Sequence, residues 1–172
     1  MELLRSINIH SDLISGLGNT VINLPFKKGI FFTKKLEEVF YDIHESSYSF
    51  LPKIIENSPA VSLKNYQVPD MITSQDILIE AEEKNIWLEL DIRHIFEIGN
   101  CIRDKKTQLS NLLCDGLQLL IFFRGIKGLL LSGRIIQQGK KLSFNFSQLS
   151  QDFIWRNKFY KISPLLKPNP VF

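Results

Sequence analysis

The stretch LQLLIFFRGIKGLLLSGRIIQQGKKLSFNFS, residues 117–147, carries the strongest secondary-structure signal in the chain. Gly125 and Gly139 divide it at points where a chain reversal favours a residue without a side chain. The last part alternates apolar with small polar residues, as a strand with one buried and one wet face does: Leu142, Phe144 and Phe146 against Ser143, Asn145 and Ser147. The stretch therefore predicts three strands joined by turns, over Leu117–Phe123, Gly128–Gln137 and Lys141–Ser147.

The residues before this stretch predict further short strands and one short helix. Apolar residues alternate with polar ones over 76–83 and again over 85–91, and a third strand-like run over 93–98 ends at Gly99-Asn100. Asp104 is then suited to cap a helix that ends near Asp115-Gly116. Its buried side would carry Leu109, Leu112 and Leu113.

The N-terminal part mixes short apolar runs with helical signals. The first thirty residues predict strands or irregular backbone with turns, because glycine and proline recur there. Thr33 can cap an amphipathic helix to about Ser46, with Leu36, Val39, Phe40 and Ile43 on its buried face. A short helical piece follows over 52–57, and residues 58–74 read as a connection between lobes.

The whole pattern is that of an α+β protein. We predict a mixed N-terminal lobe of helices and strands over residues 1–70 and a strand-rich domain with one short helix over residues 71–160. Residues 161–172 contain three prolines and predict an extended tail or a linker.

One part of this order of elements matches a known pattern. It consists of the strand that begins near Leu88, the Gly99-Asn100 turn, a helix with Leu109 and Leu112, and the apolar segments over 117–121, 129–136 and 141–146. This order resembles the first SpoA (surface presentation of antigens) domain of the cytoplasmic-ring proteins of type III secretion systems, which are related to the flagellar switch proteins. Two departures are that Asp115-Gly116 reverses the family's Gly-Asp turn, and that the usual second SpoA domain is missing.

The resemblance implies a non-enzymatic scaffold of the secretion sorting platform, with a role in protein transport. The implied partners are another SpoA-type domain and the stator-like regulator of the export ATPase, in a homo- or hetero-oligomer. The tail over 161–172 would then lead toward a second module. No cofactor is implied.

Composition limits the other classes of function. A formal charge of +3, from 21 basic and 18 acidic residues, does not predict a nucleic-acid binder, and the lysine pairs read as solvated caps and loops. Cys101 and Cys114 show no metal or disulfide spacing, so we expect reduced thiols. The first residues do not predict a secretory signal, and no apolar run predicts a membrane-spanning helix. We expect a cytoplasmic protein, at most peripheral to the inner membrane through a larger complex.

Catalytic residues are hard to find in this sequence. His10, His44 and His94 share no spacing, and His94 reads as a surface residue of a strand. An alternative function is a small metal-dependent nuclease that uses Asp70, Glu80 and Lys84. We expect an acidic solvated turn there instead, and no catalytic, cofactor or metal residues.

The candidate interaction residues are apolar. We expect the strands to form a pairing or core surface that another protein covers, and we place on it Leu117, Leu119, Ile121, Leu129, Leu131, Ile135, Phe144 and Phe146. Trp155 belongs to an aromatic and basic segment, Phe153–Lys161, that suits a protein interface. A second alternative is a chaperone-like or immunity-type binding protein, which could have this composition.

Overall fold

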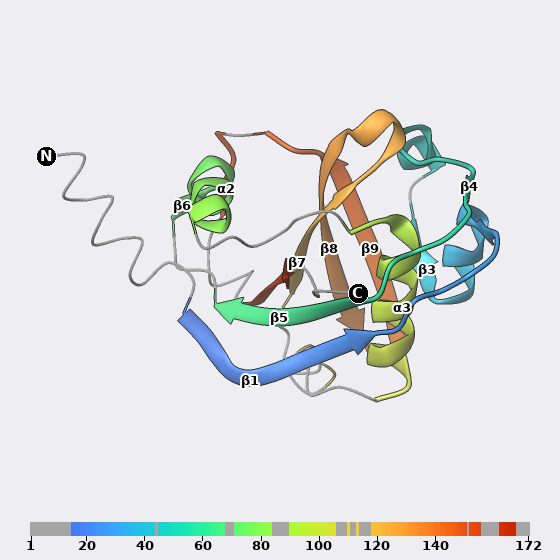
Figure 1. Cartoon of the computed structure of the whole chain (residues 1–172), viewed down its shortest axis with the longest axis horizontal. Coiled ribbons are helices and arrows are strands. Elements are labelled where there is room, and N and C mark those ends of the chain that lie inside the picture. Colours follow the sequence, from blue (N-terminus) through green and yellow to red (C-terminus); the bar gives the residue numbers. More distant parts are fainter. Residues whose placement is uncertain are drawn as a thin grey trace, which may run out of the picture.

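The computed structural model of the 172-residue chain describes residues 15–43, 45–67, 71–83, 90–105, 110, 113, 118–150, 152–155 and 162–167. Its helices and strands form an α+β fold, as predicted (Figure 1). The N-terminal part contains β1 (Ser15–Leu24), β2 (Phe31–Phe32), η1 (Thr33–Glu38), β3 (Phe40–Asp42), η2 (Glu45–Phe50), β4 (Ile54–Ile55) and β5 (Val61–Gln67). The remainder contains β6 (Ile72–Thr73), α2 (Ser74–Glu83), α3 (Ile92–Arg103), β7 (Leu119–Arg124), η3 (Ile126–Gly128), β8 (Leu130–Gln138), β9 (Lys141–Gln148), β10 (Ile154–Trp155) and β11 (Ile162–Lys167).

Seven of these strands form one mixed sheet in the order β1-β5-β11-β7-β8-β9-β3. Neighbouring strands are antiparallel except for the parallel pairs β11–β7 and β3–β9. Two small ribbons, β2–β4 and β6–β10, lie outside this sheet. The sheet joins strands from both sides of residue 70, so the predicted division into two lobes is not visible in it.

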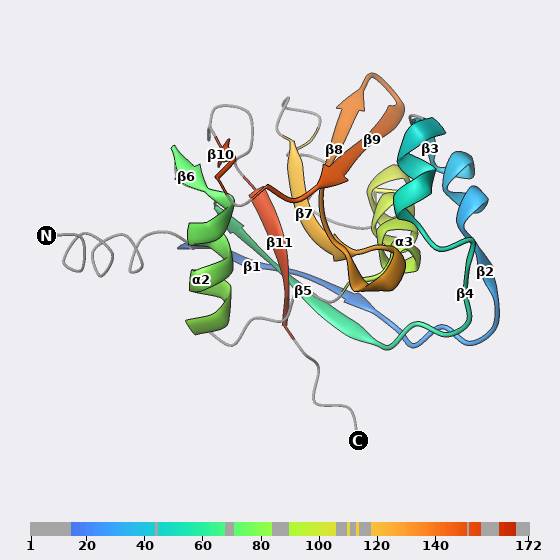
Figure 2. The same cartoon turned by 90° about the horizontal axis from the view of Figure 1, so that it is seen from above.

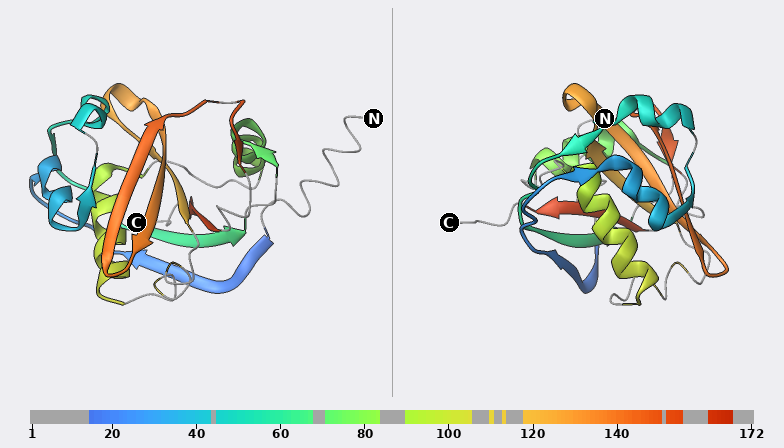
Figure 3. Two further views of the ribbon diagram at one scale, coloured as in Figure 1. Left: turned by 180° about the vertical axis from the view of Figure 1, so that it is seen from behind. Right: turned by 90° about the vertical axis from the view of Figure 1, so that its right-hand side faces the viewer.

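The helix α3 covers one face of the sheet. It contacts both β1 and β9, which stand first and sixth in the strand order. A single helix can reach both strands because the sheet curves around it, as Figure 3 shows on the right. The helix is amphipathic and buries five apolar side chains, Ile92, Ile95, Phe96, Ile98 and Ile102, in the core.

The core lies between α3 and the hairpins of β7, β8 and β9. The inward-facing side chains of these strands are buried and alternate along each strand: Leu119, Ile121, Phe123, Leu131, Ile135, Leu142, Phe144 and Phe146. At Gly133 a Cβ atom would lie 2.5 Å from the Phe144 ring, so only glycine fits there without a shift. At Gly99 it would lie 2.6 Å from Phe40, which lets α3 approach β3 closely.

The three predicted strands over residues 117–147 are confirmed as β7, β8 and β9, and the register pairs Phe122 with Ser132 and Arg134 with Asn145. The first strand begins at Leu119, and Leu117 lies outside the described residues. Expected strands or turns before residue 30 are confirmed in β1, which pairs with β5.

Several other predicted elements are wrong. The strands expected over 76–83 and 93–98 are the helices α2 and α3. The helix expected over 33–46 is the short 3₁₀ helix η1 followed by the strand β3, because Phe40 pairs with Leu142 of β9. The helical piece over 52–57 is the strand β4, and the connection over 58–74 contains β5 and β6.

The remaining differences lie beside segments outside the described residues and at the end of the chain. Most of the helix expected after Asp104 falls outside the described residues, and so does most of the strand expected over 85–91. Asp104 itself is the C-cap of α3. The expected tail contains β11, a strand between β5 and β7, which is a correction to the assignment of 161–172 as an extended end.

None of the helices that the structure describes is long and apolar enough to cross a membrane.

Candidate binding surfaces

The predicted interaction residues lie in the core of this chain. Six of them are buried beneath α3, and Leu129 is half-buried at its margin: Leu119, Ile121, Leu131, Ile135, Phe144 and Phe146. Leu117 and the side chain of Trp155 are outside the described part. The expectation that another protein covers these six side chains is therefore corrected, because α3 of the same chain already covers them.

His94 belongs to a buried polar cluster at the start of α3. The backbone N–H of Asp91 donates to His94 Nδ1 at 2.9 Å, and the Asp91 carboxylate accepts from the backbone N–H groups of Arg93 and His94. This reciprocal arrangement is a capping box. His94 is 2% exposed, so its assignment to the surface of a strand is wrong.

This cluster also contains Ser58, so that its serine, aspartate and histidine are the residue types of a catalytic triad. The Ser58 hydroxyl donates to Asp91 Oδ2 at 2.8 Å, and His94 Nε2 bonds the carbonyl oxygen of Pro59 at 2.9 Å. Because His94 Nδ1 accepts from a backbone N–H, its 3.3 Å approach to Asp91 Oδ1 is not an ion pair. In a catalytic triad the histidine lies between the other two groups, and here the aspartate does. The cluster holds the helix start.

The other predicted chemical residues do not form a described site. Glu80 is buried in α2, while Asp70 and Lys84 lie outside the described residues, as do His10, His44 and Cys114. Cys101 is half-buried on α3. Within the described ranges, no group of three histidine, cysteine or acidic side chains could hold a metal ion.

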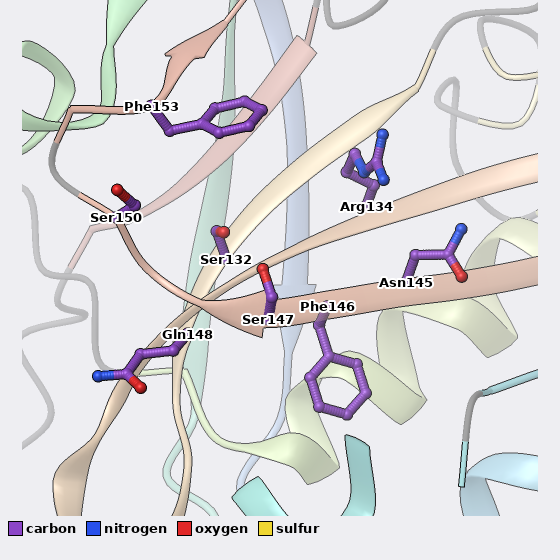
Figure 4. Close-up of a pocket in the computed structure, with 8 residues that line it drawn as sticks. All are labelled: Ser132, Arg134, Asn145, Phe146, Ser147, Gln148, Ser150 and Phe153. Carbon is purple, nitrogen blue, oxygen red and sulfur yellow. The ribbon is translucent and has the colours of Figure 1, made fainter. Parts of the chain in front are cut away.

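A polar hollow of about 210 Å³ lies on the outer face of the β8–β9 hairpin (Figure 4). Its floor consists of two directly opposed pairs, Ser132 with Ser147 and Arg134 with Asn145. The alternation of β9 turns these side chains outward and turns Phe146 inward, as Figure 4 shows. Gln148, Ser150 and Phe153 form the wall. The hollow offers hydroxyl, amide and guanidinium groups to a ligand.

The outer edge of β9 runs beside this hollow. On the side away from β8, its register with β3 covers Leu142 and Ser143. Within the described ranges, no strand pairs with Phe144–Gln148 on that side, and β9 also contacts the 3₁₀ helix η2. This part of the edge contains no charged residue and no proline, the two kinds of residue that commonly protect an edge from pairing.

Exposed apolar side chains adjoin the hollow. Phe153 is 48% exposed, Ile154 is 47% exposed and Met71 is 52% exposed. The ribbon β6–β10 brings these residues together, because Ile154 pairs with Thr73 and Ser74 donates its backbone N–H to the Phe153 carbonyl.

A second exposed apolar surface lies on the ribbon β2–β4, at the opposite end of the molecule from β6 and β10 (Figure 2). Phe32 stands directly opposite Ile54, and the two are 62% and 43% exposed. Ile30 and Phe26 are also more than half exposed. We define the lysine–aromatic face as these four residues with the lysines between and beside them in sequence: Lys27, Lys28, Lys34 and Lys53.

The adjacent residue Phe31 fixes this ribbon to the core. It is 4% exposed, and its ring centroid lies 5.1 Å from that of Phe96 on α3. Arg93 reinforces the attachment, because its guanidinium lies over the Phe31 ring and donates to the Gly29 carbonyl at 2.9 Å. The backbone carbonyls of Lys27 and Lys28 accept from the same guanidinium at 3.4 Å. The ribbon is held rigidly with Phe32 outward.

The lysine–aromatic face was not predicted from the sequence, because the lysine pairs were assigned to solvated caps and loops. Residues 26–35, FKKGIFFTKK, contain four lysines, no acidic residue and four large apolar residues, and that run was the available signal. Which of the adjacent Phe31 and Phe32 points outward depends on the pairing with β4.

Comparison with known proteins gives no relative: no protein-family model, curated protein or solved structure matches this chain.

Proposed function

We propose that this chain is a non-enzymatic assembly protein whose β9 edge pairs with a strand of another protein subunit. The observation that carries the proposal is the β9 edge over Phe144–Gln148, with which no described strand pairs on the side away from β8, next to a polar hollow and an exposed phenylalanine. Addition of a strand to an open edge supplies main-chain hydrogen bonds, and neighbouring hollows receive side chains. The hollow and Phe153 are suited to receive the side chains of the added strand.

The composition near the edge supports a protein partner. Protein interfaces are enriched in aromatic residues, methionine and arginine and depleted in lysine and acids. Phe153, Met71 and Arg134 belong to the enriched kinds. No lysine lines the hollow, which contains serine, asparagine and glutamine in addition.

A second copy of this chain is the occupant that we propose. Two identical edges can pair antiparallel about a two-fold axis, so that each edge satisfies the other. Asn145 and Ser147 are neutral, and two copies would therefore meet along Phe144–Gln148 without like charges in register. A pair of this kind would continue the sheet from one subunit into the next.

The narrower setting of a type III secretion complex rests on the SpoA resemblance alone. The helix α3 departs from that resemblance over residues 92–103, where the family pattern requires a strand and a turn. We therefore carry forward the assembly role and leave the type III setting as a prediction from the sequence.

Size-exclusion chromatography with light scattering, over a dilution series, tests the proposal. We expect wild-type chain to be dimeric at high concentration and to dissociate on dilution. Ser147→Lys places a lysine beside the two-fold axis, and we expect it to weaken the dimer about tenfold or more. Gln75→Lys on the exposed face of α2 is the control with the same change of charge. A wild-type chain that stays monomeric at the highest attainable concentration, or equal dimerisation of both variants, would overturn the proposal.

A further inference from the structure

We infer that the lysine–aromatic face binds the surface of an anionic lipid bilayer. This inference is independent of the assembly role, because the face lies on the ribbon β2–β4 at the other end of the molecule from β6 and β10 (Figure 2). It assigns to the chain a direct peripheral contact with a membrane.

The first reason is charge. Four lysines and no acidic residue lie within residues 26–35, and Lys53 precedes Ile54 on the paired strand. Lys28, Lys34 and Lys53 are exposed. Acids also lie close to these lysines in sequence: Glu37 and Glu38 follow them in η1, and Glu56 follows β4. The Glu97 carboxylate lies 3.9 Å from Lys27 Nζ. The stretch over residues 26–35, which carries four lysines and no acid, is the part of the face that is complementary to an anionic surface.

The second reason is the apolar part of the face. Phe32 is 62% exposed on the ribbon β2–β4, which stands apart from the main sheet, and Ile30 and Phe26 in the segment before it are 59% and 56% exposed. Exposure of such side chains to water is unfavourable, and their transfer to the boundary between head groups and acyl chains is favourable. Aromatic side chains favour that boundary, and lysines extend from it toward the phosphates.

The kind of cation distinguishes a bilayer from a protein partner. Protein interfaces are enriched in arginine and depleted in lysine, whereas the exposed cations of this face are all lysines. Arg93 is not one of these exposed cations, because its guanidinium donates hydrogen bonds to the backbone carbonyl groups of residues 27–29. Nucleic acid fits less well, because only Phe26 and Phe32 of the four exposed apolar residues have a ring on which a base could stack, and the others are aliphatic.

The local geometry is prepared for insertion. Gly29 adopts a φ of +92°, which favours glycine, and its N–H donates to the Asn57 side chain at 3.0 Å. Together with the Arg93 contacts, this bond fixes the turn between Lys28 and Ile30. The turn is therefore already ordered in the free protein, so that binding does not incur the entropy cost of ordering it.

Co-sedimentation of the full-length chain with vesicles tests the inference. We expect binding to vesicles of equal parts phosphatidylserine and phosphatidylcholine, weakening as salt is added, and no binding to phosphatidylcholine alone. Lys28→Gln/Lys34→Gln should weaken binding about 25-fold, at roughly fivefold for each lysine near the surface. Phe32→Ser/Ile54→Ser should weaken it about tenfold or more.

Matched variants keep the inference falsifiable. Lys105→Gln/Lys140→Gln removes two exposed lysines outside the face, and Ile79→Ser removes an exposed apolar side chain from α2. We expect both to bind as wild type does, with unchanged circular dichroism in all variants. Absence of binding to the anionic vesicles, or an equal loss in the two lysine variants, would overturn the inference. So would tighter binding of the face to polyglutamate or to a single-stranded oligonucleotide than to vesicles.

Discussion

The backbone N–H of Asp91 donates a hydrogen bond to His94 Nδ1 at 2.9 Å, and the Asp91 carboxylate caps the same turn in return. This pair begins α3, and α3 covers the apolar face of the β7–β9 hairpins. The capping pair therefore fixes the start of the helix that contributes to burying these apolar residues.

Asp91→Ala should lower the free energy of unfolding by about 1–2 kcal/mol, the usual cost of losing a helix N-cap. The Ser58 hydroxyl would also lose its acceptor. Urea unfolding followed by circular dichroism measures the change. Asp152→Ala, which removes an exposed acid, is the control and should stay within about 0.5 kcal/mol of wild type. Equal stability of Asp91→Ala and wild type would contradict the capping role.

Ile135→Ala should destabilise the chain by about 2–5 kcal/mol, because Ile135 is fully buried beneath α3. Phe153→Ala should change stability by less than about 0.5 kcal/mol, because Phe153 is 48% exposed. Thermal or urea unfolding of both variants compares them. If Ile135→Ala left stability unchanged and altered only the oligomeric state, the side chain would belong to an interface and not to the core.

Gly133→Ala should cost about 1–3 kcal/mol, because the added methyl group would overlap the Phe144 ring. Ser147→Ala on the exposed face of β9 is the control, with an expected change below about 0.5 kcal/mol. Denaturant midpoints of the two variants provide the comparison. An unchanged midpoint for Gly133→Ala would mean that the hairpin and Phe144 are not packed as described.

Tyr48 should make stability depend on pH in the alkaline range. Burial, with the nearby Glu37 carboxylate that accepts its hydroxyl hydrogen bond at 3.2 Å, raises the pKa of Tyr48 from 10.0 to about 12. A pKa that is higher in the folded state adds stability below pH 10, and this contribution is lost as pH rises toward 12. Tyr48→Phe should therefore flatten the decline in stability over that interval. Tyrosinate absorbance should show one late-titrating group more in wild type than in the variant.

The sequence predicted the β7–β9 hairpins because their signals are local. Alternation and turn glycines are properties of neighbouring residues, and Gly139 adopts the positive φ that its turn requires. Phe40 and Pro164 could not be placed in this way. Phe40 enters a strand through its pairing with Leu142, about a hundred residues away. Pro164 is unfavourable within a sheet, yet it is paired with Asn65 in β11.

The helix α3 was missed although the sequence contains its signals. Asp91 is a good N-cap, and Ile92, Ile95, Phe96 and Ile102 have helical spacing. The run over 93–98, which follows two alternating runs, was interpreted as a third strand instead. From that error it followed that the hairpins needed an external partner, so core residues were assigned to an interface. The binding surfaces could not be predicted from the sequence. Which side of β2 and of β9 faces outward depends on pairing with strands distant in the sequence.

Hydrogen–deuterium exchange at several protein concentrations tests the proposed β9 pairing most directly. The account predicts that amides within Phe144–Gln148 become better protected as wild-type concentration rises, while those of α3 do not change. In Ser147→Lys this protection should not depend on concentration. Protection of Phe144–Gln148 that is the same at all concentrations in wild type would contradict the account.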